Sequence, residues 1–284
     1  MSTTTLGAPD EGEPNRTLRK RNADAAGVTN ERPSRATLNP MQPGWLGVEL
    51  AADERTRGGV LVVDVVRRSP AAAVGLAAGD VIVRFEGQTF SEPLALIRKV
   101  RASRPGTKVA IGVLRDGKTR LVTAELAETP SSDELLERRF VGSSAPPIDP
   151  LTIVTGKTKG SWAELRGQLV ILEFSSPWCG VCQLMHRRMN EWQAQWAMHG
   201  VTVIGIAPLG PEAARSYATR FGIEFAVAAD EAEAAFHSYD VFAVPSLFLI
   251  DRRGIIVDAA TGYSSARLAQ MEKKLISLIE QGQP

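Results

Sequence analysis

The stretch Leu169-Val-Ile-Leu-Glu-Phe-Ser-Ser-Pro-Trp-Cys-Gly-Val-Cys182 decides the fold of the second half of this chain. Its apolar beginning is rich in β-forming residues and predicts a buried strand over 169–175. Apolar residues then recur at spacings of three and four, which predicts a helix over 179–198. These residues are Val181, Leu184, Met185, Met189, Trp192 and Trp196. The sequence therefore predicts a strand, a tight turn and a helix, with two cysteines at the turn.

These two residues, Cys179 and Cys182, are the only cysteines among 284 residues. We expect the first sulfur at a helix N-terminus, where unpaired N–H groups and the helix dipole favour a thiolate. The two residues between the cysteines let the second thiol reach back and close a disulfide. The arrangement indicates a dithiol that cycles between reduced and oxidised forms.

The charge balance and the amino terminus limit the classes of partner and the location. Lys and Arg total 33 against 32 Asp and Glu, so the net charge is +1 and supplies no field for nucleic acid or an anionic membrane. No apolar run approaches the roughly 20 residues that span a bilayer. The amino terminus lacks the apolar core of a secretory signal. We predict no nucleic-acid partner, no membrane span and a cytoplasmic location; the alternative is a periplasmic or secreted location if the chain is a mature form.

Changes in composition divide the chain into four segments. Residues 1–42 have few large apolar side chains and predict a disordered tail. Residues 43–127 alternate short strands and glycine turns. Residues 128–147 are polar and predict a linker, in which 134–140 is a candidate short helix. Residues 148–282 alternate strand and helix patterns, so the chain length fits two folded domains.

The expected fold class is a small β-rich domain with one or two helices, followed by an α/β domain. In the first, we expect strands at 59–66 and 81–85, a helix at 91–102, and a hairpin of 108–114 with 119–126 across Asp116-Gly117. In the second, we expect strands at 169–175, 201–207, 224–228, 246–250 and 255–260, and helices at 179–198, 211–221, 231–238 and 264–281. This alternation predicts a central sheet with helices on both faces.

The second domain resembles the thioredoxin superfamily. Trp178-Cys-Gly-Val-Cys182 follows a strand and opens a helix, and Val244-Pro245-Ser246 stands before a strand, where the family has a cis-proline beside its disulfide. Glu173 lies six residues before Cys179, where thioredoxins carry a buried Asp. The extra helix and strand between Ala207 and Asp240 resemble the thiol reductases of cytochrome c maturation. The resemblance implies a thiol–disulfide oxidoreductase.

Three positions depart from that reductase subfamily, one of which is Glu173, where the subfamily usually lacks an acid. Val181 stands before the second cysteine, where the subfamily often has proline. Met185 stands three residues after Cys182, where the subfamily often has an acid. A proton carrier relocated to Glu173 is one explanation of these differences.

The resemblance assigns a role to each candidate catalytic residue. Cys179 is expected to attack, Cys182 to resolve the mixed disulfide, and Pro245 to lie beside the disulfide. Glu173 is expected to exchange a proton with Cys182; the alternative is a strand-end carboxylate in solvent or paired with a basic residue. We expect His186 to be a partly exposed helix residue.

We expect no cofactor and no metal, because no second Cys or His pair completes a tetrahedral zinc site. Peroxidase chemistry of the peroxiredoxin kind is disfavoured, because the peroxidatic cysteine of that family sits in a different loop context.

The first domain resembles bacterial PDZ domains attached to periplasmic proteases. The resemblance rests on Gly44-Trp-Leu-Gly-Val-Glu-Leu50 and on the segment from Val66 to Ile82, which contains Gly79-Asp80. It implies a loop at Leu46, Gly47 and Val48 whose N–H groups hold a terminal carboxylate, with a strand that pairs with the peptide. Leu94, Ile97 and Val100 are candidates for the groove wall, and Ile97 is the one we select. The alternative is a β-domain whose groove is empty or filled internally.

We therefore predict a thiol–disulfide oxidoreductase that reduces protein disulfides, because Gly180-Val181 lacks the His of strongly oxidising relatives. Its expected partners are disulfide-containing proteins, an unidentified electron donor, and protein C-termini at the PDZ-like groove. The alternative is a PDZ-based scaffold in which the dithiol is secondary.

Overall fold

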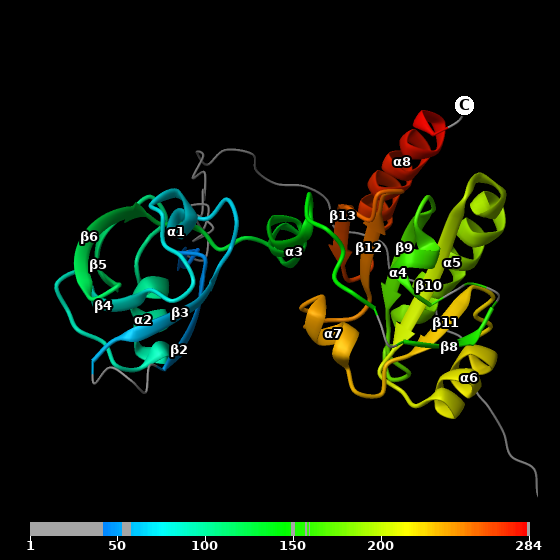
Figure 1. Cartoon of the computed structure of the whole chain (residues 1–284), viewed down its shortest axis with the longest axis horizontal. Coiled ribbons are helices and arrows are strands. Elements are labelled where there is room, and N and C mark those ends of the chain that lie inside the picture. Colours follow the sequence, from blue (N-terminus) through cyan, green and yellow to red (C-terminus); the bar gives the residue numbers. More distant parts are fainter. Residues whose placement is uncertain (1–41, 53–57, 149–150, 157, 159, 283–284) are drawn as a thin grey trace, which may run out of the picture. The chain divides into compact units, whose positions relative to one another are not determined.

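The computed structural model describes residues 42–52, 58–148, 151–156, 158 and 160–282. Apart from Gln42, the tail predicted for residues 1–42 lies outside the described residues. The expected fold class is confirmed: a β-rich domain precedes an α/β domain (Figure 1).

An antiparallel five-stranded sheet forms the first domain, in the order β2-β3-β4-β5-β6. Asp116 and Gly117, both at positive φ, turn the predicted hairpin. Leu96 and Val100 of α2 are buried in the core, whereas Leu94 is 68% exposed and is not among the residues that line the pocket between β2 and α2. The elements are β1 (Gly44–Trp45), β2 (Val48–Ala52), β3 (Val60–Val65), α1 (Pro70–Ala73), β4 (Val81–Phe85), α2 (Pro93–Ala102), β5 (Lys108–Arg115), β6 (Lys118–Glu125) and β7 (Ala127–Glu128).

A mixed six-stranded sheet forms the second domain, in the order β13-β12-β9-β10-β11-β8. Strands β9, β10 and β11 are parallel, and β8, β12 and β13 run antiparallel to their neighbours. Its strands are β8 (Thr152–Thr155), β9 (Leu169–Phe174), β10 (Val201–Ala207), β11 (Ala226–Ala229), β12 (Ser246–Ile250) and β13 (Ile256–Thr261). Its helices are α3 (Ser132–Phe140), α4 (Trp162–Leu165), α5 (Cys182–Trp196), the 3-10 turn η1 (Ala197–His199), α6 (Pro211–Arg220), α7 (Ala234–Ser238) and α8 (Ser265–Gln281).

Alternate residues of β9 enter two separate cores. Val170, Leu172 and Phe174 pack with residues of α3, α4 and α7, whereas Leu169 and Ile171 pack with residues of α5 and α8. Every residue of β9 is buried, which explains its almost unbroken apolar sequence. Helices therefore cover both faces of this sheet, as predicted.

Helix α5 begins at Cys182 rather than at residue 179, and its buried stripe is narrower than expected. Met185, Met189, Trp192 and Trp196 are buried, but Val181 and Leu184 are 48% and 55% exposed. The spacing of three and four predicts one apolar face for all six residues, but only four of them are buried in the helix.

The segment expected as a linker, 128–147, contains α3, which packs into the second domain. A capping box between Ser131 and Glu134 starts the helix, because each side chain satisfies the other residue's N–H. Leu136 and Phe140 are buried in the core that Val170 also enters. The middle of this segment therefore belongs to a folded element.

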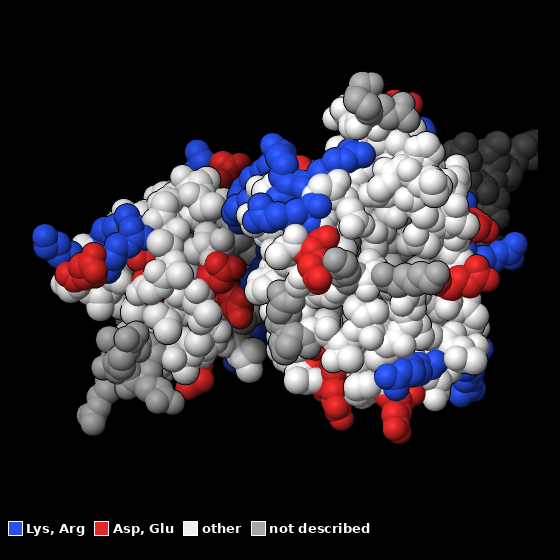
Figure 2. Space-filling model, turned by 45° about the vertical axis from the view of Figure 1, so that its right-hand side comes forward, with Lys and Arg blue, Asp and Glu red and all other residues white. Residues whose placement is uncertain are grey.

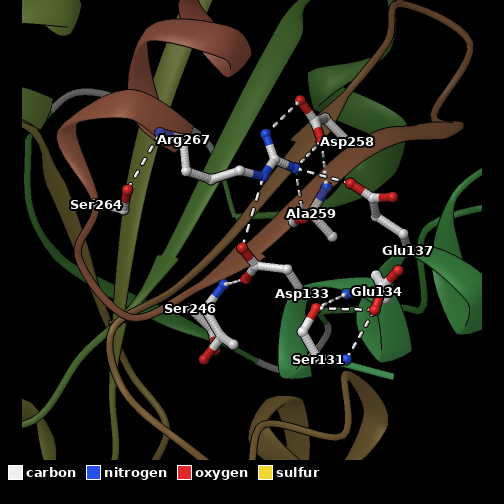
Figure 3. A network of polar contacts seen from close by, with 10 residues as sticks. Ser131, Asp133, Glu134, Glu137, Ser246, Asp258, Ala259, Ser264 and Arg267 are labelled. Atoms are coloured by element: carbon white, nitrogen blue, oxygen red, sulfur yellow. Dashed lines mark hydrogen bonds and ion pairs between the residues drawn. The ribbon is translucent and has the colours of Figure 1, made fainter. Parts of the chain in front are cut away.

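Arg267 of α8 fastens α3 to the sheet (Figure 3). Its guanidinium donates to a carboxylate oxygen of Asp258, to the carbonyl of Ala259 at 2.8 Å and to Glu137 of α3 at 3.1 Å. Asp133 of α3 lies 3.7 Å from the same guanidinium. Only 15% of the Arg267 side chain is exposed, so these ion pairs are partly shielded from solvent.

Charged side chains form separate groups of both signs on the face shown in Figure 2, with broad uncharged areas between them. This pattern agrees with the near-neutral net charge of the sequence.

Replacing Arg267 by Ala should destabilise the second domain by about 2–3 kcal/mol, because three carboxylates lose their shared cation. Urea unfolding followed by tryptophan fluorescence measures the change. The control is Arg253→Ala, whose side chain is 80% exposed and pairs only with Asp251, so its effect should stay within about 1 kcal/mol. Equal destabilisation by both substitutions would contradict the fastening role of Arg267.

Candidate active site

The chain leaves β9 at Phe174 and reaches the first turn of α5 at Cys182 through a short loop that contains Cys179. The two cysteines are joined in a disulfide, with their Cα atoms 5.3 Å apart. Cys182 is completely buried, whereas Cys179 is half-buried beside the exposed Trp178. Only Cys179 is therefore open to another molecule.

The surroundings of Cys179 favour negative charge on its sulfur. The backbone N–H of Cys182, the first residue of α5, donates to the Cys179 Sγ at 3.1 Å. A helix N-terminus carries unpaired donors and a positive partial charge, which stabilise a thiolate in the reduced protein. The Sγ also lies 3.7 Å from the carbonyl oxygen of Val244. Val244 precedes Pro245 through a cis peptide bond, so the structure brings Pro245 next to the disulfide.

Glu173 is completely buried on the face of β9 that α5 covers. Burial raises the pKa of its carboxyl group to about 8, against a smaller opposing effect of the Ser175 hydroxyl. The alternative of a solvent-exposed carboxylate does not hold. Gly205 is the neighbour of Glu173 on β10, and a Cβ there would clash with a ring carbon of Phe225 at 2.8 Å, whereas it would lie at an ordinary contact distance of 3.4 Å from Glu173 Oε2.

His186 is also buried, and the expectation of a partly exposed helix residue is wrong. Its side chain is 2% exposed, and its Nε2 lies 3.5 Å from Glu173 Oε1. His186 follows Cys182 by four positions, so both side chains lie on the buried face of α5. That spacing puts His186 on the same side of the helix as Cys182, but the sequence alone does not show that this side is buried. Burial lowers the pKa of His186 to about 4, so its imidazole is neutral at pH 7.

A second hollow, of about 290 Å³, lies between β2 and α2 of the first domain. Its lining includes Leu46, Gly47, Val48 and Ile97, all four of the residues selected from the sequence. Leu96 also lines it and was missed, because the spacing along α2 does not show which side of the helix faces the sheet. Most of the residues that line the hollow are apolar, and some of them belong to β2, which is an edge strand of the sheet.

Within the described residues, no group of three or more His, Cys, Asp or Glu side chains is placed to hold a metal ion. No helix in the described part of the chain is both long enough and apolar enough to cross a bilayer.

Family models match both domains. The model of the PDZ domain matches residues 44–126, and the model of the AhpC/TSA family matches residues 141–259. The two resemblances inferred from the sequence are thereby confirmed.

Individual relatives match one domain each. The "Thiol-disulfide oxidoreductase ResA" of Bacillus thuringiensis is 31% identical over 127 residues, which cover 44% of this chain and 72% of ResA. The "Probable periplasmic serine endoprotease DegP-like" of Chlamydia trachomatis is 34% identical over 120 residues, which cover 42% of this chain but only 24% of that protease. A solved thioredoxin domain of a thiol-disulfide oxidoreductase from Bacteroides vulgatus is 19% identical, with a TM-score of 0.41 over 47% of this chain and 96% of that one.

The predicted cytoplasmic location is wrong. The relatives that match the chain include periplasmic proteins, and the prediction had rested only on the lack of a recognisable signal. A sequence that begins without an apolar segment does not by itself define a compartment.

The redox assignment rests on agreement between the site and its relatives. A disulfide at the start of a helix, a cis-proline beside it and a buried acid beneath that helix occur in a chain that is similar to ResA over most of the length of ResA. The chain therefore belongs to the thioredoxin-like family of thiol–disulfide oxidoreductases, and it carries a PDZ domain in front of the redox domain.

Proposed function

We propose that this protein reduces disulfides in other proteins outside the cytoplasm, and that its PDZ groove holds the carboxyl termini of its partners. The proposed reduction of disulfides rests on one observation, which is that the two cysteine sulfurs differ in accessibility and hydrogen bonding. Cys179 is accessible and accepts the first N–H of α5, whereas Cys182 is buried. The location is supported by the periplasmic relatives of the first domain.

The proposed reaction begins with the Cys179 thiolate, which attacks one sulfur of the substrate disulfide and releases the other as a thiolate. Cys182 then transfers its proton to the ionised carboxyl group of Glu173 and attacks the Cys179 Sγ. The second substrate sulfur leaves, and the disulfide of the protein forms. Two electrons pass to the substrate, and an unidentified dithiol donor restores the reduced form by the reverse steps.

The groove proposal rests on backbone donors and an open sheet edge. Strand β2 lies at the edge of its sheet, so one side of it is available to an added peptide strand. Among the described residues, the N–H groups of Leu46 and Gly47 make no backbone hydrogen bond, although both carbonyl groups accept one. Two free donors beside an apolar hollow suit a terminal carboxylate that follows an apolar side chain.

Replacing Cys182 by Ser should trap mixed disulfides between Cys179 and substrate proteins, because the resolving thiol is absent. Replacing Cys179 by Ser should trap none, since the remaining thiol is buried. Non-reducing gels of the reduced variants incubated with insulin count the trapped species. Equal trapping by both variants would reverse or remove the assigned roles.

Replacing Glu173 by Gln should slow the resolving step by about a hundredfold above pH 8, because the variant has no proton acceptor. In the wild type, the rate should rise with pH as the carboxyl group ionises near its pKa of about 8. Single-turnover mixing over a pH series measures both curves.

A stability measurement is an independent check on Glu173. A folded-state pKa raised above the unfolded value gives stability that is present below the unfolded pKa and lost as pH rises through about 8. Glu173→Gln should therefore unfold at higher urea concentration than the wild type near pH 8. In the kinetic experiment, a Glu173→Gln variant with the pH–rate profile of the wild type would show that Glu173 does not accept the proton.

Peptide binding by the groove should require a free carboxyl terminus and an apolar last residue. Ile97→Asp should weaken binding by about tenfold or more, because the charge enters the apolar hollow. The matched control is Leu94→Asp on the same helix, which is exposed and does not line the hollow. Calorimetric titration with free and amidated peptides makes the comparison.

Gly47 offers a second test of the groove. A Cβ at this position would lie 2.3 Å from the Ser69 Cβ, and its φ is +82°, so a bulky residue should distort the carboxylate loop and abolish binding. Equal affinity for free and amidated peptides would show that the hollow does not recognise a carboxylate.

A further inference from the structure

A buried polar cluster beneath α5 is larger than the proposed reaction requires. His186 Nε2 lies 3.5 Å from Glu173 Oε1 and 3.0 Å from the hydroxyl oxygen of Tyr217. The Tyr217 hydroxyl donates to the Ser175 Oγ at 3.1 Å. Four polar side chains from β9, the loop after it, α5 and α6 thus meet in the interior.

If these side chains only filled space in the core, the cluster would lower the stability of the folded protein. Neither carboxyl oxygen of Glu173 nor the Nδ1 of His186 has a hydrogen-bond partner within the described residues. Each buried polar atom that lacks a partner costs free energy, whereas apolar residues such as Ile171 fill the same face without this penalty. Buried polar groups without partners are expected at functional sites, where a chemical role is retained at a cost in folding stability.

The groups that face Glu173 are few. They are His186 of α5, the Ser175 hydroxyl of the loop after β9, and Tyr217 of α6; Cys182 is one turn before His186 on the same buried face of α5. The paired residues on β10 and β12 are Gly205 and Leu247, which carry no charge. In the described part of the chain, no Lys or Arg is paired with Glu173.

The hydrogen bonds determine which nitrogen of His186 carries the proton. Because the Tyr217 hydroxyl donates to Ser175, its oxygen is left to accept from His186, which requires a proton on Nε2. Nε2 is also the nitrogen that faces Glu173. The N–H that a neutral imidazole donates to Tyr217 therefore also lies beside the carboxyl group, where its dipole acts on a carboxylate without a direct hydrogen bond.

We propose that His186 is a positioning residue for Glu173, and that its Nε2–H, fixed by Tyr217 and Ser175, stabilises the carboxylate that accepts the proton of Cys182. The proton moves from the Cys182 Sγ to a carboxyl oxygen of Glu173, and His186 keeps its own proton throughout. This inference rests on the proposed role of Glu173. It also gives α6, part of the extra segment between Ala207 and Asp240, a role at the redox site through Tyr217.

The test compares His186→Leu, His186→Phe and His186→Gln with the wild type. Leu and Phe remove the donor, and Phe suits the neighbouring rings of Tyr217, Phe221 and Phe225 if Leu prevents folding. Gln restores an N–H donor. The resolving rate is measured by single-turnover mixing with insulin from about pH 6 to about pH 10, and the ionisation of Glu173 is followed separately through its infrared carbonyl band.

We expect Leu and Phe to move the midpoint of the pH–rate curve upward by about one unit and to slow the resolving step about tenfold at pH 7. The rate near pH 10 should match the wild type, and Gln should restore most of the shift. In a Glu173→Gln background, loss of His186 should have no additional effect.

Three results would overturn the proposal: an unchanged midpoint, an equal loss of rate at every pH, or an additional loss in the Glu173→Gln background. Failure of the proposed function is a separate result, because insulin would then stay oxidised with the wild type at every pH. The infrared midpoint of Glu173 would still report whether His186 lowers its pKa.

Discussion

The beginning of α5 at Cys182 is the constraint on which the redox domain depends. Its first N–H donates to the Cys179 Sγ, which requires Cys179 to lie in the loop just before the helix. The buried stripe of α5, with Met185 and Met189, packs on the face of β9 that holds Ile171. One packing arrangement therefore places the accessible sulfur at the end of the sheet and covers the next inward-facing position of β9, which is Glu173.

The residues that surround Glu173 include a glycine and two polar side chains. A carboxyl group in an apolar core has to be accommodated, and on the adjacent strand it is paired with Gly205, whose missing side chain leaves space for Phe225. His186 and Tyr217 then bring polar atoms to the same place, from a helix that the motif defines and from a helix that belongs to the extra segment. The buried histidine and the tyrosine are thus two polar neighbours of one buried acid, supplied by two different helices.

Much of this arrangement could be predicted from the sequence, since β9, β10, β12 and α8 follow from strongly periodic apolar patterns and the cysteine spacing marks the turn. His186 could not, because a lone histidine on a helix is buried or exposed according to what packs against it, and the packing partner is α6. The same reason explains Leu94 and Leu96: their spacing fits a helix in either orientation, and only the sheet below shows which one is buried. Short elements such as β8 and α4 carry too few residues for a periodic signal.

Under the proposed function, the PDZ domain binds the partner and the redox domain carries out the exchange, so that even weak binding at the groove is useful. Disulfide exchange is bimolecular, so its rate depends on how often a substrate disulfide meets Cys179. A partner held by its carboxyl terminus in the groove at Leu46 and Ile97 stays tethered, and a short flexible tether gives an effective concentration of about a millimolar. In the proposed function, the groove selects which proteins are reduced, and the proposed roles of Glu173 and His186 set how quickly each exchange is completed. Selection by the groove requires no change at the redox site, because the exchange chemistry is the same for every substrate disulfide.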